Sequence, residues 1–493
     1  MNIQTKVIRV PLLAATVTFL LCTIIVPSWA QAPKNINKSA NEAIALYNQG
    51  LTLYQQGQVD NAIALYRQAL AIDPYLPEAL SNLGLALNSK GQVDDAIAAY
   101  RQALALNPDF PEALSNLGLA LDSKGKDDEA VVDLDKALKI RPADPIAESN
   151  LGLALYHERK YPDSIAAYQK ALAIHPQFPE AYNGMGASYF GAGQTDDAIA
   201  AYHKALALSP KYVDALNNLG AALNSKRQWD DAVAVFEQAL ALKPDDGDIR
   251  ANYAAALRNA GRTEDSSTAY REVVAKHPDD AHAWFELGHL QYSEQHFADA
   301  AASLQKSLAL QPNQPEAQFT LASTYQDEGK ISESIDAYQK GLALDPANAH
   351  ALYNLGNAYL AAKQYRNSAA TFRKALKAQP DFPEAALGLG AALTQAGDLG
   401  GAEIAYNALI SQHPENAEAR FNLGNVLFNK GQYNVAADAY REAVRLRPDY
   451  AHAHYNLATT LARLQDYKAA TQEFREAQKL DPSLVPPKDV LTQ

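Results

Sequence analysis

The chain has 493 residues, 48% of them hydrophobic, and a formal net charge of −13 at pH 7. A protein this acidic is repelled by phosphate backbones and by anionic lipid surfaces, which argues against nucleic acid as its ligand. Its single cysteine, Cys22, excludes a fold held by internal disulfides.

The first 30 residues have the pattern of a secretory signal peptide. Lys6 and Arg9 precede an apolar run over residues 10–26, and Ser28-Trp29-Ala30 places small residues at the two positions that a signal peptidase reads. We predict cleavage after Ala30 and a periplasmic or secreted mature protein. The alternative is an uncleaved membrane anchor, although the run is shorter than the roughly 20 apolar residues that a spanning helix needs. Contact with a membrane is expected only in that alternative.

Residues 31–42 are a polar lead-in for which we expect no regular structure, and a 34-residue repeat then continues to Leu484. A proline recurs at this step without a slip in register: Pro74, Pro108, Pro142, Pro176, Pro210, Pro244, Pro278, Pro312, Pro346, Pro380, Pro414, Pro448 and Pro482. The thirteen predicted repeats are 43–76, 77–110, 111–144, 145–178, 179–212, 213–246, 247–280, 281–314, 315–348, 349–382, 383–416, 417–450 and 451–484, followed by a C-terminal tail at 485–493. A fixed period of this length is typical of a solenoid and leaves no room for a separate catalytic domain.

Each repeat is predicted to contain two helices. In repeat 77–110, Leu80, Leu83 and Leu87 form one apolar stripe at helical spacing, and Gly91 ends the first helix. Two aspartates open the second helix, where carboxylates suit the positive end of the helix dipole. Pro108 ends it, because proline disfavours the helical conformation in the residue before it.

Small and large side chains recur at fixed positions of the repeat. The eighth residue is glycine in ten of the thirteen repeats, as at Gly84. Glycine inside a helix costs about 1 kcal/mol relative to alanine, so its repetition indicates a neighbouring helix that passes too close for a larger side chain. The twentieth residue is always alanine or serine, as at Ala96, and the twenty-fourth is usually aromatic, as at Tyr100. Large side chains packed against small ones predict an all-α solenoid.

These residues resemble the tetratricopeptide repeat. Its pattern is present as Trp284, Leu287-Gly288, Ala300 and Pro312 in one repeat, and as Leu83-Gly84, Ala96, Tyr100, Ala103 and Pro108 in another. The resemblance covers all thirteen repeats. It implies a right-handed superhelix of antiparallel helix pairs, with a concave groove lined by the first helices that holds extended peptides or partner segments.

The sixth residue of the repeat is the candidate binding position, because asparagine, a mediocre helix former, recurs there in the middle of a helix. The asparagines are Asn48, Asn82, Asn116, Asn150, Asn218, Asn252, Asn354, Asn422 and Asn456. Gly184, Glu286, Thr320 and Gly388 interrupt the column. The glutamates four residues before it, such as Glu78 and Glu112, share its helix face. We expect that face to line the groove.

Two interpretations of this asparagine column remain open. A carboxamide offers a donor and an acceptor, so a ladder of them can pair with the backbone of an extended peptide. The column is similar in this respect to the asparagine ladder of O-linked N-acetylglucosamine transferases. Alternatively, each asparagine bonds a carbonyl group of the adjacent repeat and only fixes the stack. If the ladder binds peptide, its unbroken stretch from Asn48 to Asn150 is the predicted track.

No catalytic, metal or cofactor site is expected. His282, His289 and His296 are spaced by seven residues, which places successive residues too far apart to ligate one metal ion. Two short Gly-x-Gly sequences lie within predicted helices, whereas a dinucleotide-binding loop would follow a strand. The sequence contains no signature of a hydrolase, a metalloprotease or a phosphate-binding loop.

The sequence therefore predicts a non-catalytic scaffold that binds other proteins or peptides outside the cytosol. An alternative is a regulatory or assembly subunit of an envelope or secretion complex. A glycosyltransferase of the O-linked N-acetylglucosamine type is disfavoured, because that family's catalytic domain follows the array and only nine residues follow Leu484 here.

Overall fold

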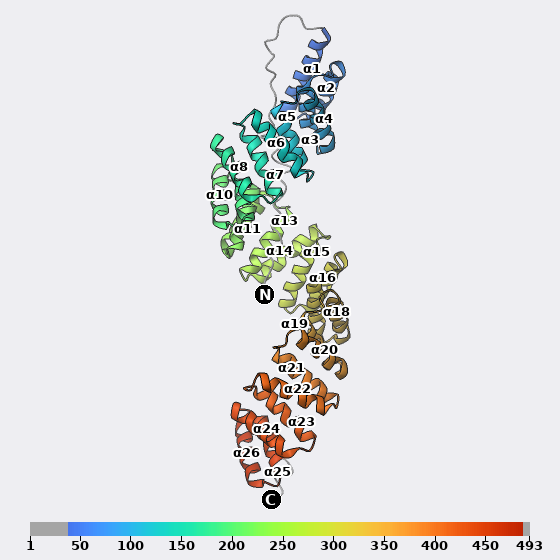
Figure 1. The fold of residues 1–493 in the computed structure, drawn as a ribbon, viewed down its shortest axis with the longest axis vertical. Coiled ribbons are helices and arrows are strands. Elements are labelled where there is room, and N and C mark those ends of the chain that lie inside the picture. Colours follow the sequence, from blue (N-terminus) through green and yellow to red (C-terminus); the bar gives the residue numbers. More distant parts are fainter. Residues whose placement is uncertain (1–37, 487–493) are drawn as a thin grey trace. The chain divides into compact units, whose positions relative to one another are not determined.

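A computed structural model describes residues 38–486. The predicted signal peptide, its cleavage point and the end of the tail lie outside the described residues. Within them the fold is all-α, with 26 helices in chain order and no strand, as predicted (Figure 1). The chain divides into an N-terminal unit, Met1–Ala269, and a C-terminal unit, Tyr270–Gln493. The boundary falls inside helix α14.

Each 34-residue repeat contributes two helices. The first helices are α1 (Lys38–Gln55), α3 (Pro77–Ser89), α5 (Pro111–Asp122), α7 (Pro145–His157), α9 (Pro179–Gly191), α11 (Val213–Ser225), α13 (Gly247–Asn259), α15 (Ala281–Ser293), α17 (Pro315–Asp327), α19 (Ala349–Ala361), α21 (Pro383–Gln395), α23 (Ala417–Asn429) and α25 (Ala451–Arg463). The second helices are α2 (Val59–Ile72), α4 (Val93–Leu106), α6 (Asp127–Ile140), α8 (Tyr161–Ile174), α10 (Thr195–Leu208), α12 (Trp229–Leu242), α14 (Thr263–Lys276), α16 (Phe297–Leu310), α18 (Ile331–Leu344), α20 (Tyr365–Ala378), α22 (Leu399–Gln412), α24 (Tyr433–Leu446) and α26 (Tyr467–Leu480).

The two helices of a repeat form a hairpin because a very short turn joins them. Within each unit, helices adjacent in sequence pack together, and the first helices of consecutive repeats also touch, as α5 touches α7 and α21 touches α23. The first helices therefore form a continuous row in each unit. None of the described helices is long and apolar enough to cross a membrane.

Every turn between the paired helices contains one residue in the left-handed conformation. Gly91 is there with φ of 76°, which confirms its predicted role in ending the first helix. Five repeats have no glycine at this position, and Arg159, Arg227, Gln295, Lys363 and Gln465 take the same conformation, with φ between 57° and 67°. The packing of the two helices thus imposes the turn even on residues with a side chain.

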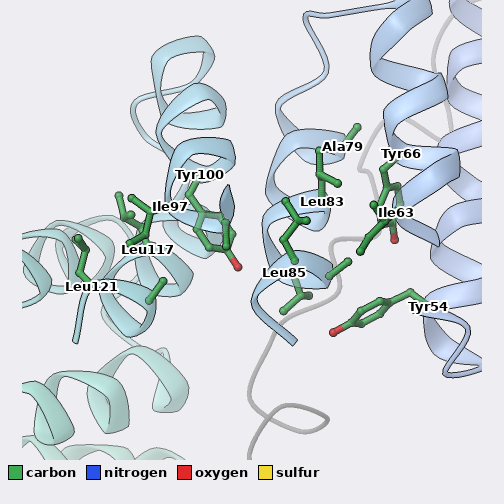
Figure 2. Close-up of a cluster of buried hydrophobic side chains, with 14 of the residues drawn as sticks. Tyr54, Ile63, Tyr66, Ala79, Leu83, Leu85, Ile97, Tyr100, Leu117 and Leu121 are labelled. Atoms are coloured by element: carbon green, nitrogen blue, oxygen red, sulfur yellow. The ribbon is translucent and has the colours of Figure 1, made fainter. Parts of the chain in front are cut away.

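The predicted contact of large side chains with small ones is confirmed in the hydrophobic core. A Cβ atom added to Gly84 would lie 2.7 Å from Cε1 of Tyr100, the fully buried aromatic residue of the second helix of the same repeat. Figure 2 shows Tyr100 and Tyr66 with the leucines and isoleucines of neighbouring helices in one cluster. Serine replaces alanine at the twentieth position in four repeats, and in three of them its hydroxyl bonds the carbonyl of the eighth residue, as Ser368 bonds Gly356 at 2.8 Å. The hydroxyl of the fourth, Ser334, is buried without a hydrogen-bond partner among the described residues.

One boundary differs from the sequence prediction. The lead-in was expected to be irregular as far as residue 42, but α1 already begins at Lys38. Most later first helices begin at a proline or directly after a capping Asp or Asn. The lead-in has neither just before Ala43, so the helix extends by several residues toward the N-terminus. At the other end, α26 stops at Leu480 as expected before Pro482.

Candidate functional site

The candidate site is the ladder face, by which we mean the fifth, sixth and ninth residues of each repeat, all on the first helices. The structure places the sixth-position asparagines in different environments. Asn48 is exposed, and Asn82, Asn116, Asn150 and Asn218 are buried. Asn252, Asn354, Asn422 and Asn456 are half-buried.

In the N-terminal unit four of these asparagines bond to the preceding repeat. Asn82 donates from Nδ2 to the hydroxyl of Tyr47 at 2.9 Å, and Asn150 donates to Oγ of Ser115 at 3.3 Å. Asn218 and Asn252 donate to Oδ1 of Asn183 and Asn217, each at 3.0 Å. In all four cases the acceptor lies 35 residues earlier, at the fifth position of the previous repeat. All four acceptors are side-chain atoms: one phenol and one serine hydroxyl, and two amide carbonyl oxygens.

The residue at the fifth position differs between the two units. In the N-terminal unit it is small or polar at nearly every repeat: Tyr47, Ser81, Ser115, Ser149, Asn183, Asn217 and Ala251. In the C-terminal unit it is apolar or aromatic: Phe285, Phe319, Tyr353, Leu387, Phe421 and Tyr455. A phenylalanine or leucine accepts no hydrogen bond. The asparagine of the next repeat must then find another partner or none.

The asparagines of the C-terminal unit show this consequence. The amide of Asn354 bonds the hydroxyl of Tyr338 in the preceding second helix. Asn456 donates to Oδ1 of Asn425 at 2.8 Å, and the same oxygen accepts from the hydroxyl of Tyr440 at 2.7 Å. The side chain of Asn422 has no hydrogen bond to another described residue, although it is half-buried.

The six apolar side chains at the fifth position of the C-terminal unit are all half-buried, so each presents part of its surface to solvent. Five of the six are aromatic, and at least two of these rings pack against a second aromatic ring. The ring centroids of Phe421 and Tyr450 are 4.8 Å apart, and those of Tyr353 and Phe382 are 5.2 Å apart. Such tilted pairs hold an aromatic ring in a fixed orientation. The C-terminal unit therefore carries a fixed row of partly exposed apolar side chains on consecutive first helices.

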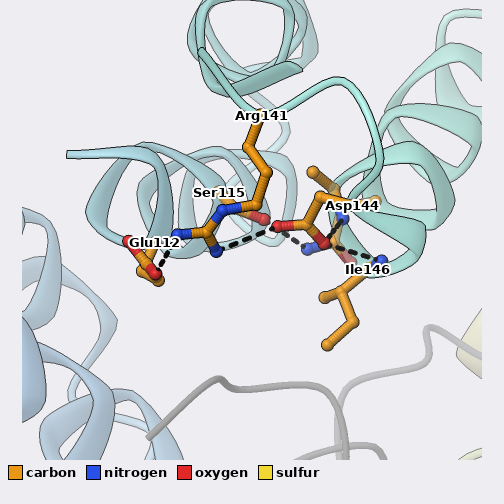
Figure 3. A network of polar contacts seen from close by, with 7 residues as sticks. Glu112, Ser115, Arg141, Asp144 and Ile146 are labelled. Atoms are coloured by element: carbon orange, nitrogen blue, oxygen red, sulfur yellow. Dashed lines mark hydrogen bonds and ion pairs between the residues drawn. The ribbon is translucent and has the colours of Figure 1, made fainter. Parts of the chain in front are cut away.

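The glutamate column, four residues before the asparagines, makes a structural contact in at least one repeat junction. Arg141 lies between Glu112 and Asp144, with Nη2 2.5 Å from Oε1 of Glu112 and Nη1 3.7 Å from Oδ2 of Asp144 (Figure 3). Asp144 in turn caps α7 by accepting hydrogen bonds from the backbone N–H groups of Ile146 and Ala147, at 3.0 and 3.1 Å. Glu112 is thus bound to the repeat junction through Arg141.

A second row of contacts between repeats has the same 35-residue separation, and none of its residues belongs to the asparagine column. It lies at the C-terminal ends of the first helices. Nδ2 of Asn259 donates to Oδ1 of Asn224 at 3.0 Å, and the hydroxyl of Tyr292 donates to Asp327 at 2.8 Å. In the same row, Nδ1 of His157 lies 2.8 Å from Oδ1 of Asp122. A search of the sequence for polar pairs 35 residues apart could have found these three contacts.

The structure brings together no catalytic constellation from the histidines singled out in the sequence. His282 lies 3.8 Å from Oε1 of Glu286, His289 stacks on Phe285, and His296 lies 3.3 Å from Glu294. These are three separate contacts. In the described part of the chain, three or more metal-ligating side chains converge only at Asp122, Asp127 and His157.

Models of the tetratricopeptide repeat match consecutive stretches of the chain. The model described as "TPR repeat" matches residues 50–88, 84–122, 120–158, 159–193 and 322–362. Models described as "Tetratricopeptide repeat" match residues 183–247, 355–417, 405–444 and 421–484, residues 223–287, and residues 281–314. Together these matches cover 50–314 and 322–484.

Several solved structures are similar to this chain. One is PilW, described as a widely conserved type IV pilus biogenesis factor, with 23% identity, coverage of 44% of this chain and 98% of that chain, and a TM-score of 0.40. Another is the APC/C hetero-tetramer Cut9–Hcn1, with 16% identity, coverage of 92% and 96%, and a TM-score of 0.36. A third is a thermophilic TPR protein of Thermus thermophilus, with 26% identity, coverage of 37% and 98%, and a TM-score of 0.33. No curated protein sequence matches the chain.

Proposed function

The chain belongs to the tetratricopeptide repeat family, and from this premise we propose that it is a non-catalytic scaffold that holds extended segments of other proteins, outside the cytosol. Repeats of this family mediate protein–protein interactions, which makes the chain a protein-interaction scaffold. The finer parts of the proposal are the type of partner segment, the place where it binds and the compartment.

The row of half-buried apolar side chains in the C-terminal unit is the observation that carries the proposal. Six consecutive first helices each present one such side chain, from Phe285 to Tyr455. Half-buried amides lie beside it at Asn354, Asn422 and Asn456. An extended segment offers side chains that can cover apolar surface, and every backbone unit offers hydrogen-bonding groups to amides. A face that combines apolar side chains with amides is therefore better suited to bind an extended segment than to bind the charged surface of a folded protein.

The N-terminal unit supports this function less well. There the amide donors of Asn82, Asn150, Asn218 and Asn252 already bond the preceding repeat. A peptide would have to replace those bonds with bonds of its own. Each neutral hydrogen bond contributes only about 0.5–1.5 kcal/mol net, so the exchange of one for another adds little to the free energy of binding. We therefore place the segment on the C-terminal unit. The alternative track from Asn48 to Asn150 stays open as an outcome of the test.

The proposed location outside the cytosol rests on the N-terminal sequence alone. Lys6, Arg9 and the apolar run at residues 10–26 have the order of a signal peptide, and the chain that follows Ala30 contains no cysteine. Mass measurement of the protein isolated from its native cell tests the proposal. A mature chain that begins at Gln31 supports it. A full-length chain recovered in the membrane fraction would favour the anchored alternative.

Site-specific photo-cross-linking tests where partners bind. Benzoylphenylalanine replaces Phe319, Phe421 or Asn116, one at a time, and Ile404 as the control. Ile404 is a large apolar residue that is 73% exposed on the second helix α22. We expect cross-links from positions 319 and 421 to a short contiguous segment of another protein. Cross-links from position 116 alone would move the track to the N-terminal unit. Equal cross-linking from position 404 would contradict a site on the first helices.

A further inference from the structure

Three side chains with metal-binding chemistry meet where repeat 111–144 packs on repeat 145–178. Asp122 is the last residue of α5, Asp127 is the first residue of α6, and His157 is the last residue of α7. One ligand atom from each lies within 4.8 Å of the other two. Nδ1 of His157 and Oδ1 of Asp122 are the closest pair, at 2.8 Å.

The stacking of repeats does not require this composition. The equivalent contact between two later repeats is a neutral amide pair, Asn224 with Asn259. A pair of amides therefore suffices to join two repeats at this position. The Asp122–His157 pair differs because both of its side chains can bind a metal ion, and because a third such side chain joins it.

The third side chain breaks the pattern of its own column. The seventeenth residue of the repeat opens the second helix and carries no charge in the other twelve repeats: Val59, Val93, Tyr161, Thr195, Trp229, Thr263, Phe297, Ile331, Tyr365, Leu399, Tyr433 and Tyr467. Asp127 is the exception. Its Oδ1 atom is buried and has no hydrogen-bond partner. An unpartnered carboxylate oxygen next to two potential ligands points to a group that the contacts within the protein do not supply.

The charges of the cluster are not balanced by basic side chains. Among the described residues, no lysine or arginine forms an ion pair with Asp122 or Asp127, and His157 is the sole partner of Asp122. Asp122 is only 5% exposed. Two neighbouring carboxylates, one of them buried, are unfavourable together unless a cation lies between them.

We propose that Asp122, Asp127 and His157 bind a divalent transition-metal ion, for which Zn²⁺ is the probe, and that this ion joins the two repeats. Zn²⁺ binds imidazole nitrogen and carboxylate oxygen at about 2.0–2.2 Å, so its ligand atoms in a tetrahedral site lie roughly 3.4 Å apart. Small side-chain rotations bring the three residues to that spacing. Ca²⁺ and Mg²⁺ fit less well, because they prefer six or more ligands that are all oxygen.

Three protein ligands leave one position for water in a four-coordinate site. The metal requires ionised carboxylates and an imidazole nitrogen with a free lone pair, so no proton can remain on the coordinating nitrogen of His157. The ligands come from α5, α6 and α7, and bound metal therefore ties both helices of one repeat to the first helix of the next. The metal ion would therefore act as a local cross-link within the N-terminal unit.

The test uses the tag-free mature chain, freed of metal and titrated with Zn²⁺ by calorimetry. Asp127→Asn removes one ligand and leaves the Asp122–His157 bond in place. Asp128→Asn is the matched control, because it makes the same change of charge at an adjacent exposed residue. We expect one Zn²⁺ per chain, affinity at least about tenfold weaker in Asp127→Asn and in His157→Gln, and affinity within about twofold of wild type in Asp128→Asn.

Two further measurements separate metal binding from a folding defect. Thermal unfolding shows whether Zn²⁺ raises the midpoint of wild type and not that of Asp127→Asn, while helical circular dichroism confirms that both are folded. Co²⁺ in place of Zn²⁺ gives an absorption spectrum that reports a tetrahedral site. The proposal is overturned if wild type and Asp127→Asn bind Zn²⁺ equally, or if Asp128→Asn weakens binding as much as Asp127→Asn. It also fails if wild type does not bind Zn²⁺ at micromolar concentration.

Discussion

Nδ2 of Asn218 donates a hydrogen bond to Oδ1 of Asn183 at 3.0 Å, and the two residues lie 35 positions apart in the chain. The separation is one repeat plus one residue. Because both side chains are buried, the bond is protected from competition with water. The same pairing of the sixth position of one repeat with the fifth position of the previous repeat occurs at four repeat junctions of the N-terminal unit.

The pair leads to a prediction about stability. Asn218→Ala and Asn183→Ala should each destabilise the N-terminal unit by about 1 kcal/mol, with a coupling energy of about 0.5–1.5 kcal/mol in the double-mutant cycle. Urea unfolding of the four proteins measures it. Asn422→Ala is the control and should have little effect, because Asn422 forms no such bond. A coupling energy of zero would show that the bond does not hold the repeats together.

The aromatic residue that covers the eighth-position glycine should be the most sensitive part of each repeat. Phe236 is fully buried against Gly220, where an added Cβ would lie 2.8 Å from its ring. Phe236→Ala leaves a cavity and should cost about 3–5 kcal/mol. Val132→Ala, at a residue that is 54% exposed, should change stability by no more than about 0.5 kcal/mol.

Amide hydrogen exchange is the suitable measurement for this pair of variants. In a solenoid each repeat contacts only its neighbours, so loss of protection should centre on residues 213–246. Loss that is spread evenly over the whole N-terminal unit would contradict nearest-neighbour stabilisation.

The left-handed turn residues predict a substitution that increases stability. Lys363 has φ of 57°, a conformation that costs an L-residue about 1–2 kcal/mol and costs glycine nothing. After subtraction of the extra entropy of glycine in the unfolded chain, Lys363→Gly should stabilise the C-terminal unit by about 0.5–1 kcal/mol. Gly397→Ala should destabilise it by a similar amount, since a Cβ there meets nothing within 4 Å and only the backbone conformation opposes it.

The control for Lys363→Gly is Lys374→Gly, the same change at an exposed residue inside α20. It should destabilise by about 1 kcal/mol, because glycine is a poor helix former. The urea unfolding midpoints of Lys363→Gly, Gly397→Ala and Lys374→Gly, compared with that of wild type, test these predictions. If Lys363→Gly lowers the midpoint as Lys374→Gly does, the side chain of Lys363 contributes more than the strained backbone costs.

Buried phenols predict loss of stability at alkaline pH. Burial raises the pKa of Tyr406 to about 12 and raises the pKa of Tyr202 further above its ordinary value. The pKa of these phenols is higher in the folded state than in the unfolded state. Each buried phenol therefore contributes fully to the free energy of unfolding below about pH 10, the ordinary pKa of tyrosine. This contribution is then lost as the pH rises toward 12. We therefore expect unfolding to become progressively easier over that range.

Parallel titrations by helical circular dichroism and phenolate absorbance check the alkaline prediction. Tyr202→Phe removes one buried phenol and should move the unfolding midpoint to higher pH, whereas Tyr75→Phe, at a residue that is 77% exposed, should leave it unchanged. Ionisation of all tyrosines near pH 10 without any loss of helix would contradict the predicted coupling.

The sequence by itself determined the architecture. The 34-residue period predicted two helices in every repeat, and the column of glycines opposite aromatic residues identified the packing within a repeat. Gly84 and Tyr100 are only 16 residues apart, so their contact follows from one short segment that recurs along the chain. In five turns the left-handed position is occupied by a residue other than glycine, such as Lys363. The residue type at these positions does not predict the left-handed conformation, because the packing of the paired helices imposes it.

Only the tertiary structure decided which side chains meet across repeats. The period marked the asparagine column but not its acceptors, and it gave no reason to join Asp122, Asp127 and His157. Those contacts depend on how far one helix pair is offset from the next, and the offset is set by packing between neighbouring first helices. A pattern that repeats within each helix pair contains no information about that offset, so the folded chain was needed to show that the contacts join residues 35 positions apart. Once this separation is known, the polar pairs can be found in the sequence.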